Sequence, residues 1–117
     1  MNEDWARPVV HFEIEARELD VLVPFYEAMF HWDVGDGSIR FFAAGLGGPE
    51  PGPAGHFRQS DHGGVTLYVQ VANLAASLEL ATSLGGEVTL EAFDVPGGPT
   101  LAAIKDPEGN PVTLVQQ

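Results

Sequence analysis

The chain contains no cysteine among its 117 residues. This absence excludes thiol nucleophiles, thiolate metal sites and disulfide bonds. Basic residues are also scarce: 5 Lys and Arg stand against 17 Asp and Glu, and the formal net charge is −12 at pH 7. Because such a chain repels a nucleic-acid backbone and an anionic membrane surface, we expect neither as a partner.

Long apolar runs are absent too. No stretch approaches the roughly 18 apolar residues of a membrane-spanning helix. The segment Met1–Pro8 lacks the basic start and apolar centre of a secretion signal. We therefore expect a cytoplasmic protein. The length and the 44% hydrophobic content favour a single domain over residues 1–117.

An alternating pattern occurs twice, at an offset of 55 residues. The apolar positions are Val10, Phe12, Ile14 and Ala16 in the first copy, and Val65, Leu67, Val69 and Val71 in the second. Alternation of this kind predicts a strand with one buried face. The intervening residues point to the other face, and they are His11, Glu13 and Glu15, then Thr66, Tyr68 and Gln70.

In the first half, residues 9–16 are the predicted strand, and apolar residues at helical spacing follow it from Leu19 to Phe30. Pro24 is tolerated in a first helical turn, so we expect the helix to begin near Val21 and to end near His31. Residues 38–44 are rich in strand formers, residues 45–55 form a Gly- and Pro-rich loop, and residues 56–59 form a short strand.

The second half has clearer boundaries. Residues 64–71 predict a strand, Asn73 is a candidate N-cap, and a helical stripe of Leu74, Leu78, Ala81 and Leu84 ends at two glycines. Strands are expected at 87–93, 99–105 and 111–115. Asp106 and Glu108 resemble a catalytic carboxylate pair but suit a turn better. Helices on one face of mainly antiparallel sheets predict an α+β fold.

Four segments carry a family resemblance: HFEI at 11–14, FYEAMFHW at 25–32, LGGEV at 84–88 and DPEGNPVTLVQQ at 106–117. Together they resemble the glyoxalase, bleomycin-resistance and dioxygenase proteins, the vicinal oxygen chelate superfamily. The resemblance implies two βαβββ modules, about 8–60 and 63–117, forming paired half-barrels around a central cleft. It also implies a homodimer.

Enzymes of that superfamily commonly hold one divalent metal through His, Gln and Glu from the first and last strands of both modules. The first ligand position falls on His11, but its counterpart falls on Thr66, and Thr113 stands where a Glu is usual. The 55-residue offset projects the fourth position onto Arg58, and a shift of two residues projects it onto His56. Because a hydroxyl is a poor ligand and a guanidinium repels cations, we expect no metal cofactor.

Three interpretations of His11 stay open. It ligates a metal with His56 and Glu13, or it binds a ligand or acts as an acid or base in a metal-free cleft, or it is purely structural. Arg58 either clamps a ligand's carboxylate or phosphate or lies on the surface. Tyr68 has an aromatic body and a polar tip, which suit a cleft wall.

Two aromatic residues near the end of the first helix, Phe30 and Trp32, are expected to anchor the core. Between them, His31 replaces the Gly that is usual in the family's F-G-W segment. Because His adopts a left-handed backbone less readily than Gly, the replacement disfavours that conformation here.

The leading hypothesis is a protein that binds a small, partly apolar molecule between its modules without a metal, either to sequester it or to carry out metal-independent chemistry. One alternative is a metal-dependent glyoxalase-like lyase or isomerase, or an extradiol-type dioxygenase. A third is a non-catalytic interaction module. The identity of the ligand does not follow from the residues.

Overall fold

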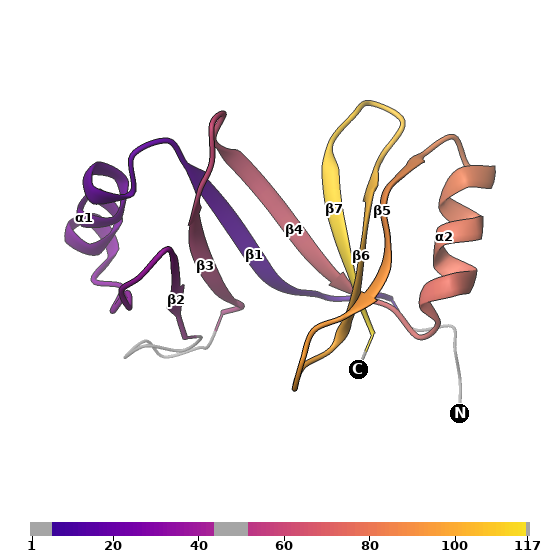
Figure 1. Ribbon diagram of the computed structural model, residues 1–117, viewed down its shortest axis with the longest axis horizontal. Helices are drawn as coiled ribbons and strands as arrows, with labels where there is room; N and C mark the ends of the chain where they lie inside the picture. The colour runs from indigo at the N-terminus through magenta and orange to yellow at the C-terminus, as the bar shows by residue number, and fades with distance from the viewer. Residues whose placement is uncertain (1–5, 44–51, 117) are drawn as a thin grey trace. The chain divides into compact units, whose positions relative to one another are not determined.

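A computed structural model describes residues 6–43 and 52–116, and it has the predicted α+β composition. Figure 1 labels the elements: β1 (Val9–Ala16), α1 (Leu19–Phe30), β2 (Ile39–Phe42), β3 (Ala54–Gln59), β4 (Gly64–Gln70), α2 (Leu74–Ser83), β5 (Glu87–Asp94), β6 (Thr100–Lys105) and β7 (Pro111–Gln116). Neither of the helices in these ranges is long and apolar enough to cross a membrane.

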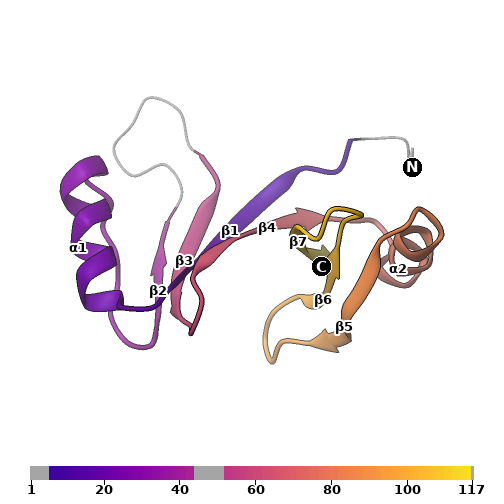
Figure 2. The ribbon, with the colours of Figure 1, turned by 90° about the horizontal axis from the view of Figure 1, so that it is seen from above.

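The chain divides into two compact units. The first unit is residues 11–65, and the second is residues 1–10 together with 66–117. The strand order within the first unit is β2-β3-β1, with β3 antiparallel to β2 and parallel to β1 (Figure 2). The order within the second is β4-β7-β6-β5, with β4 parallel to β7.

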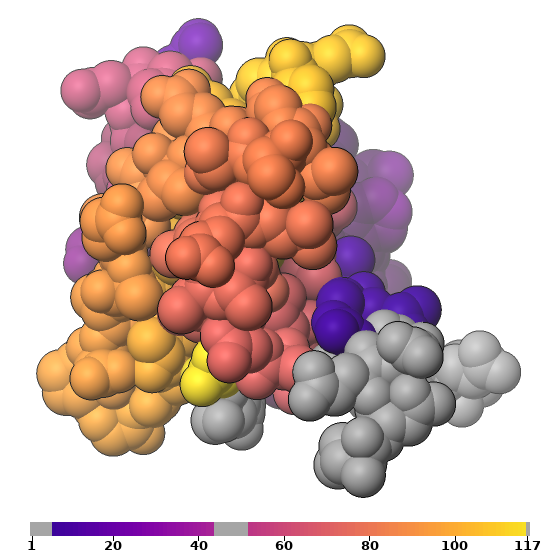
Figure 3. Space-filling model, turned by 90° about the vertical axis from the view of Figure 1, so that its right-hand side faces the viewer, coloured from indigo at the N-terminus to yellow at the C-terminus, as the bar shows by residue number. Residues whose placement is uncertain are grey.

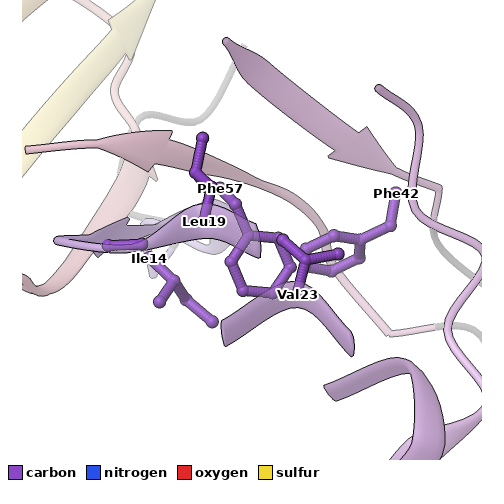
Figure 4. Close-up of a cluster of buried hydrophobic side chains, with 6 residues drawn as sticks. Ile14, Leu19, Val23, Phe42 and Phe57 are labelled. Atoms are coloured by element: carbon purple, nitrogen blue, oxygen red, sulfur yellow. The ribbon is translucent and has the colours of Figure 1, made fainter. Parts of the chain in front are cut away.

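The core of the first unit lies between its sheet and α1. Phe57 of β3 is completely buried, and Figure 4 shows it among Ile14, Leu19, Val23 and Phe42. The Trp32 ring stacks on Phe42 with a centroid separation of 4.4 Å. The prediction that Trp32 anchors the core is thus confirmed.

Helix α1 begins two residues earlier than expected. Leu19 and Val23 are both buried, and the Glu18 carbonyl accepts hydrogen bonds from the backbone of residues 21 and 22. Packing of Leu19 therefore extends the helix beyond the start that Pro24 favours. Pro24 then lies past the first turn, where its missing N–H leaves out one helical hydrogen bond, to the Asp20 carbonyl.

The end of α1 also differs from the prediction. Met29 and Phe30 are more than half exposed, so the buried stripe stops before them, and Phe30 is not a core anchor. His31 adopts the left-handed conformation although its side chain disfavours it, with φ 59° and ψ 31°. Its N–H donates to the Glu27 carbonyl at 2.9 Å, which closes the helix and offsets the backbone strain.

Strand β3 begins at Ala54, inside the predicted loop; the rest of that loop, residues 44–51, lies outside the described residues. The strand extends this far because Gly55 fits under an aromatic ring. A Cβ at Gly55 would come within 2.6 Å of Phe42 Cζ and 2.9 Å of the Phe12 carbonyl oxygen. Glycine here marks close packing and not a turn.

In the second unit, α2 packs against β5, β6 and β7. Asn73 caps the helix as predicted, and its Oδ1 accepts the Ala76 N–H at 2.9 Å. Leu74 and Leu78 are buried as predicted. Leu84 is 69% exposed, so it does not belong to the buried stripe of α2. Figure 3 shows the outer surface of α2 with β5 and β6 beside it.

Burial along β4 departs from the predicted alternation. Val65 and Leu67 are exposed, and Thr66 between them is buried. The apolar core of this unit gathers instead around Val71, where α2 begins and covers the neighbouring strands. The last predicted turn is confirmed, because the Asp106 carboxylate accepts the backbone N–H groups of residues 108 and 110.

Candidate functional site

The strand register of the first unit places four polar side chains together. In the parallel pair of β1 and β3, Glu13 lies opposite His56 and Glu15 lies opposite Arg58. Their neighbours Ile14 and Phe57 point to the other face, into the core. The same alternation that builds the core therefore gathers the polar residues on the opposite face.

A chain of short hydrogen bonds joins two of these side chains to each other and to His11. His11 Nε2 lies 2.8 Å from His56 Nδ1, and His56 Nε2 lies 2.8 Å from Glu13 Oε2. His56 and Glu13 are buried, and His11 is partly exposed. The chain thus leads from two buried side chains, Glu13 and His56, to the partly exposed His11.

Arg58 joins both carboxylates to this chain. Its Nε donates to Glu13 Oε2 at 2.9 Å, and its Nη2 donates to Glu13 Oε1 at 3.3 Å and to Glu15 Oε1 at 2.7 Å. The Glu13 and Glu15 side chains are only 10% and 11% exposed, whereas Arg58 is 42% exposed. The guanidinium therefore compensates two nearly buried negative charges, which would be costly without it.

The pKa values reflect this arrangement. Burial raises the pKa of Glu13, but the hydrogen bonds from His56 and Arg58 and the guanidinium charge outweigh burial and lower that pKa to about 2. Burial lowers the pKa of His11, the nearby His56 lowers it further, and Glu13 opposes both effects. At neutral pH Glu13 is therefore a carboxylate and His11 a neutral imidazole.

One neighbour of the histidines was missed by the sequence reasoning. Phe41 of β2 lies opposite His56, with ring centroids 5.3 Å apart, and its ring is 6.4 Å from that of His11. Phe41 is 59% exposed. The alternation of side chains along β2 could have identified Phe41. Because Phe42 packs in the core, its neighbour Phe41 must point to the opposite face, which it shares with His56.

The remaining predicted site residues, Thr66, Tyr68 and Thr113, belong to the second unit. Tyr68 and Thr113 are register partners in the parallel pair of β4 and β7, and Thr66 is buried on β4. The structure therefore gathers His11, Glu13, His56 and Arg58 in one unit, and pairs Tyr68 with Thr113 in the other.

The register also corrects one projection. Tyr68 is the counterpart of Glu13 at the 55-residue offset, and Tyr68 lies opposite Thr113 just as Glu13 lies opposite His56. The first-unit equivalent of Thr113 is therefore His56, and the projection onto Arg58 is two residues too far. The length of chain between the first strand and the last strand differs between the two units. The constant offset of 55 residues therefore does not align their last strands.

The donor set does not match the metal site that the resemblance implies. Both carboxylate oxygens of Glu13 bind Arg58, and one also binds His56. Within residues 6–43 and 52–116, no group of three His, Asp or Glu side chains is arranged to hold a metal ion. A guanidinium beside the carboxylate also opposes cation binding.

Comparison with known proteins supports the fold. A solved superfamily member from Vibrio splendidus 12B01 has a TM-score of 0.69 and 13% identity, covering 96% of this chain and 100% of its own. A hypothetical protein, BH1468 from Bacillus halodurans C-125, has a TM-score of 0.68 and 10% identity, covering 97% and 96%. Methylmalonyl-CoA epimerase from Mycobacterium tuberculosis has a TM-score of 0.61 and 18% identity, covering 92% and 85%.

At these identities the solved structures show a shared fold and nothing more. Comparison with curated protein sequences finds no match. The family match is more direct, because residues 11–115 match the Glyoxalase-like domain. The chain therefore belongs to the glyoxalase-like domain family, within the glyoxalase/bleomycin resistance/dioxygenase superfamily.

Proposed function

We propose that this protein binds a small, partly apolar molecule at the polar face of β1 and β3, without a divalent metal. His11 supplies the hydrogen-bonding group and Phe41 an apolar wall. The role is sequestration or metal-independent chemistry. The partial exposure of His11 and the exposed Phe41 ring beside it support contact with a ligand at this face.

The observation that carries the proposal is that the Glu13 carboxylate already accepts hydrogen bonds from its neighbours. Among the polar side chains of the first unit it is the natural carboxylate ligand for a hard cation, yet it is already bound by His56 and Arg58. Displacing these partners would leave Arg58 facing the incoming cation. The network is therefore better suited to orienting His11 than to holding a metal.

A thermal-shift screen tests the proposal. Wild-type protein is screened against neutral, partly apolar compounds of low molecular mass, with and without a chelator. A bound compound raises the melting temperature by mass action, and we expect hits that persist in the chelator. His11→Gln should abolish the shift, and His62→Gln should retain it, because His62 is an exposed histidine outside the network.

Two results would contradict the proposal. Shifts that require added Zn²⁺, Ni²⁺, Mn²⁺ or Fe²⁺ would favour a metal-dependent lyase, isomerase or dioxygenase. An absence of hits that depend on His11 would favour the non-catalytic interaction module.

We further propose that the protein is a homodimer. The apolar side chains of Val21, Phe25 and Met29 recur every four residues along α1, and all are more than half exposed. Such a stripe suits contact with another protein surface. Sedimentation equilibrium at micromolar concentration should give twice the chain mass of 12.5 kDa. A monomer at all concentrations would contradict this proposal.

A further inference from the structure

The positions of the protons in the histidine pair follow from Glu13. An ionised carboxylate can only accept hydrogen bonds, so His56 Nε2, at 2.8 Å from Glu13 Oε2, must carry a proton. A neutral His56 then has a lone pair on Nδ1. Because that atom faces His11 Nε2 at 2.8 Å, His11 Nε2 carries the proton that joins the two rings.

This assignment fixes the tautomer of His11. With Nε2 protonated and the ring neutral, the basic lone pair is on Nδ1. The buried carboxylate of Glu13 acts through the ring of His56. It thus determines which ring nitrogen of the partly exposed His11 accepts a proton.

We infer that Glu13, His56 and His11 form a proton relay in which His11 Nδ1 accepts a proton from a bound ligand and His56 retains the resulting positive charge beside Glu13. His11 contacts the ligand, whereas His56 and Glu13 are positioning residues. The ligand class is a small molecule with an acidic O–H, N–H or C–H group. This role rests on the proposed function, but the proton arrangement does not depend on a ligand.

The step balances without another reactant. The ligand's acidic proton moves to His11 Nδ1, and the ligand keeps the bonding electron pair as an anion. The proton on His11 Nε2 moves to His56 Nδ1. His11 is then neutral in its other tautomer, and the imidazolium of His56 pairs with the Glu13 carboxylate. The relay leaves the positive charge on His56, one ring away from the ligand's anion.

The surrounding groups favour His56 over His11 as the final location of the charge. Of the two histidines only His56 contacts Glu13 directly, and the single Arg58 guanidinium donates to both Glu13 and Glu15, so two carboxylates face one fixed cation. The strand β2 contributes Phe41, which has no charge. Two adjacent imidazolium ions would place facing N–H groups 2.8 Å apart, so the pair accepts one proton and resists a second.

Nitrogen-15 NMR of histidine-labelled protein tests the relay directly. Two-bond correlations distinguish protonated from bare ring nitrogens, and His31 and His62 serve as exposed internal references. At pH 7.5 we expect the Nε2–H tautomer for both His11 and His56.

Two variants test the contribution of the carboxylates. Glu13→Gln should lower the fraction of the Nε2–H tautomer in both rings at pH 7.5, because an amide can also donate and no longer requires a proton on His56 Nε2. Glu15→Gln is the matched control, and it should leave both tautomers unchanged, since Glu15 bonds Arg58 and neither histidine.

Three results would overturn the relay: an Nδ1–H tautomer of His11 at pH 7.5, an Nδ1–H tautomer of His56 at that pH, or equal changes of tautomer in the two Gln variants. Since the NMR experiment needs no ligand, failure of the proton arrangement and failure of the proposed function are distinguishable. Correct tautomers without any His11-dependent hit in the thermal-shift screen would remove the function and the transfer from a ligand, and would leave the proton arrangement. The reverse pattern would remove only the relay.

Discussion

His56 lies opposite Glu13 in the parallel pair of β1 and β3, and its Nε2 donates to Glu13 Oε2 at 2.8 Å. Both residues are buried, at 7% and 8% exposure. A carboxylate and an imidazole at this depth compensate each other only if their hydrogen bonds are nearly complete. The stability of the first unit and the proposed role of His11 therefore depend on the same contact.

The lowered pKa of Glu13 makes the free energy of unfolding depend on pH in the acidic range. Its ordinary value of 4.5 falls to about 2 in the folded protein. The stabilisation is present in full above pH 4.5, and it is lost as the pH falls through 2, because the unfolded chain binds the proton first. The free energy of unfolding should fall by up to about 3 kcal/mol across this window. Urea unfolding at several pH values measures it.

Glu13→Gln is the reference for that experiment. The variant should be less stable than the wild type at pH 6, and the difference should narrow steadily from pH 4.5 downward. Parallel curves for the two proteins would show that Glu13 is not the group responsible.

Removing Arg58 should destabilise the fold more than removing its one contact with Glu15. Arg58→Met leaves Glu13 and Glu15 without their shared guanidinium, at a cost of about 2–3 kcal/mol, below the range for fully buried pairs because Arg58 is 42% exposed. Glu15→Gln should cost about 1 kcal/mol or less. Chemical denaturation at pH 7 measures both, and a smaller effect for Arg58→Met than for Glu15→Gln would contradict the network.

Substitution of Gly55 by any larger residue should lower the stability of the first unit. Its added Cβ would lie 2.6 Å from Phe42 Cζ, which must then rotate away from the Trp32 ring that it stacks on. Gly55→Ala is expected to cost about 1–3 kcal/mol, as overpacking does. Gly52→Ala is the control, since a Cβ there meets nothing within 4 Å. Calorimetry should therefore separate the two variants, and equal melting temperatures would argue against the packing described.

The left-handed backbone of His31 predicts an order of stability. His31→Gly removes the Cβ strain and should stabilise by up to about 1 kcal/mol, whereas His31→Val should destabilise by about 1 kcal/mol or more, since a branched Cβ disfavours φ 59°. Urea midpoints at pH 7 give the order directly. If the Val variant were as stable as the Gly variant, the helix would end in another conformation.

The sequence alone was sufficient for the features that depend on local pattern. Alternation along residues 10–16 predicted both the buried face and the polar face, and so identified His11 and Glu13 as candidates. Asn73 was recognised as a cap from its position before an apolar stripe. Each of these signals lies within a few residues of the feature that it predicts.

Features that depend on partners distant in sequence could not be predicted from the sequence alone. Pairing of Glu13 with His56 depends on the register of two strands separated by 43 residues, and an offset taken from the other unit misplaced it by two. The strand start at Ala54 depends on the fit of Gly55 under Phe42. His31 adopts its strained backbone because it closes α1. In each case tertiary packing overrides the local preference.

The most direct test of the account is a calorimetric titration of chelator-treated, dialysed protein with Zn²⁺, repeated with Ni²⁺ and Mn²⁺. The network of His11, His56, Glu13 and Arg58 predicts no stoichiometric binding, because the donor atoms already bond one another. One equivalent of metal bound by the wild type and lost in His11→Gln would contradict it.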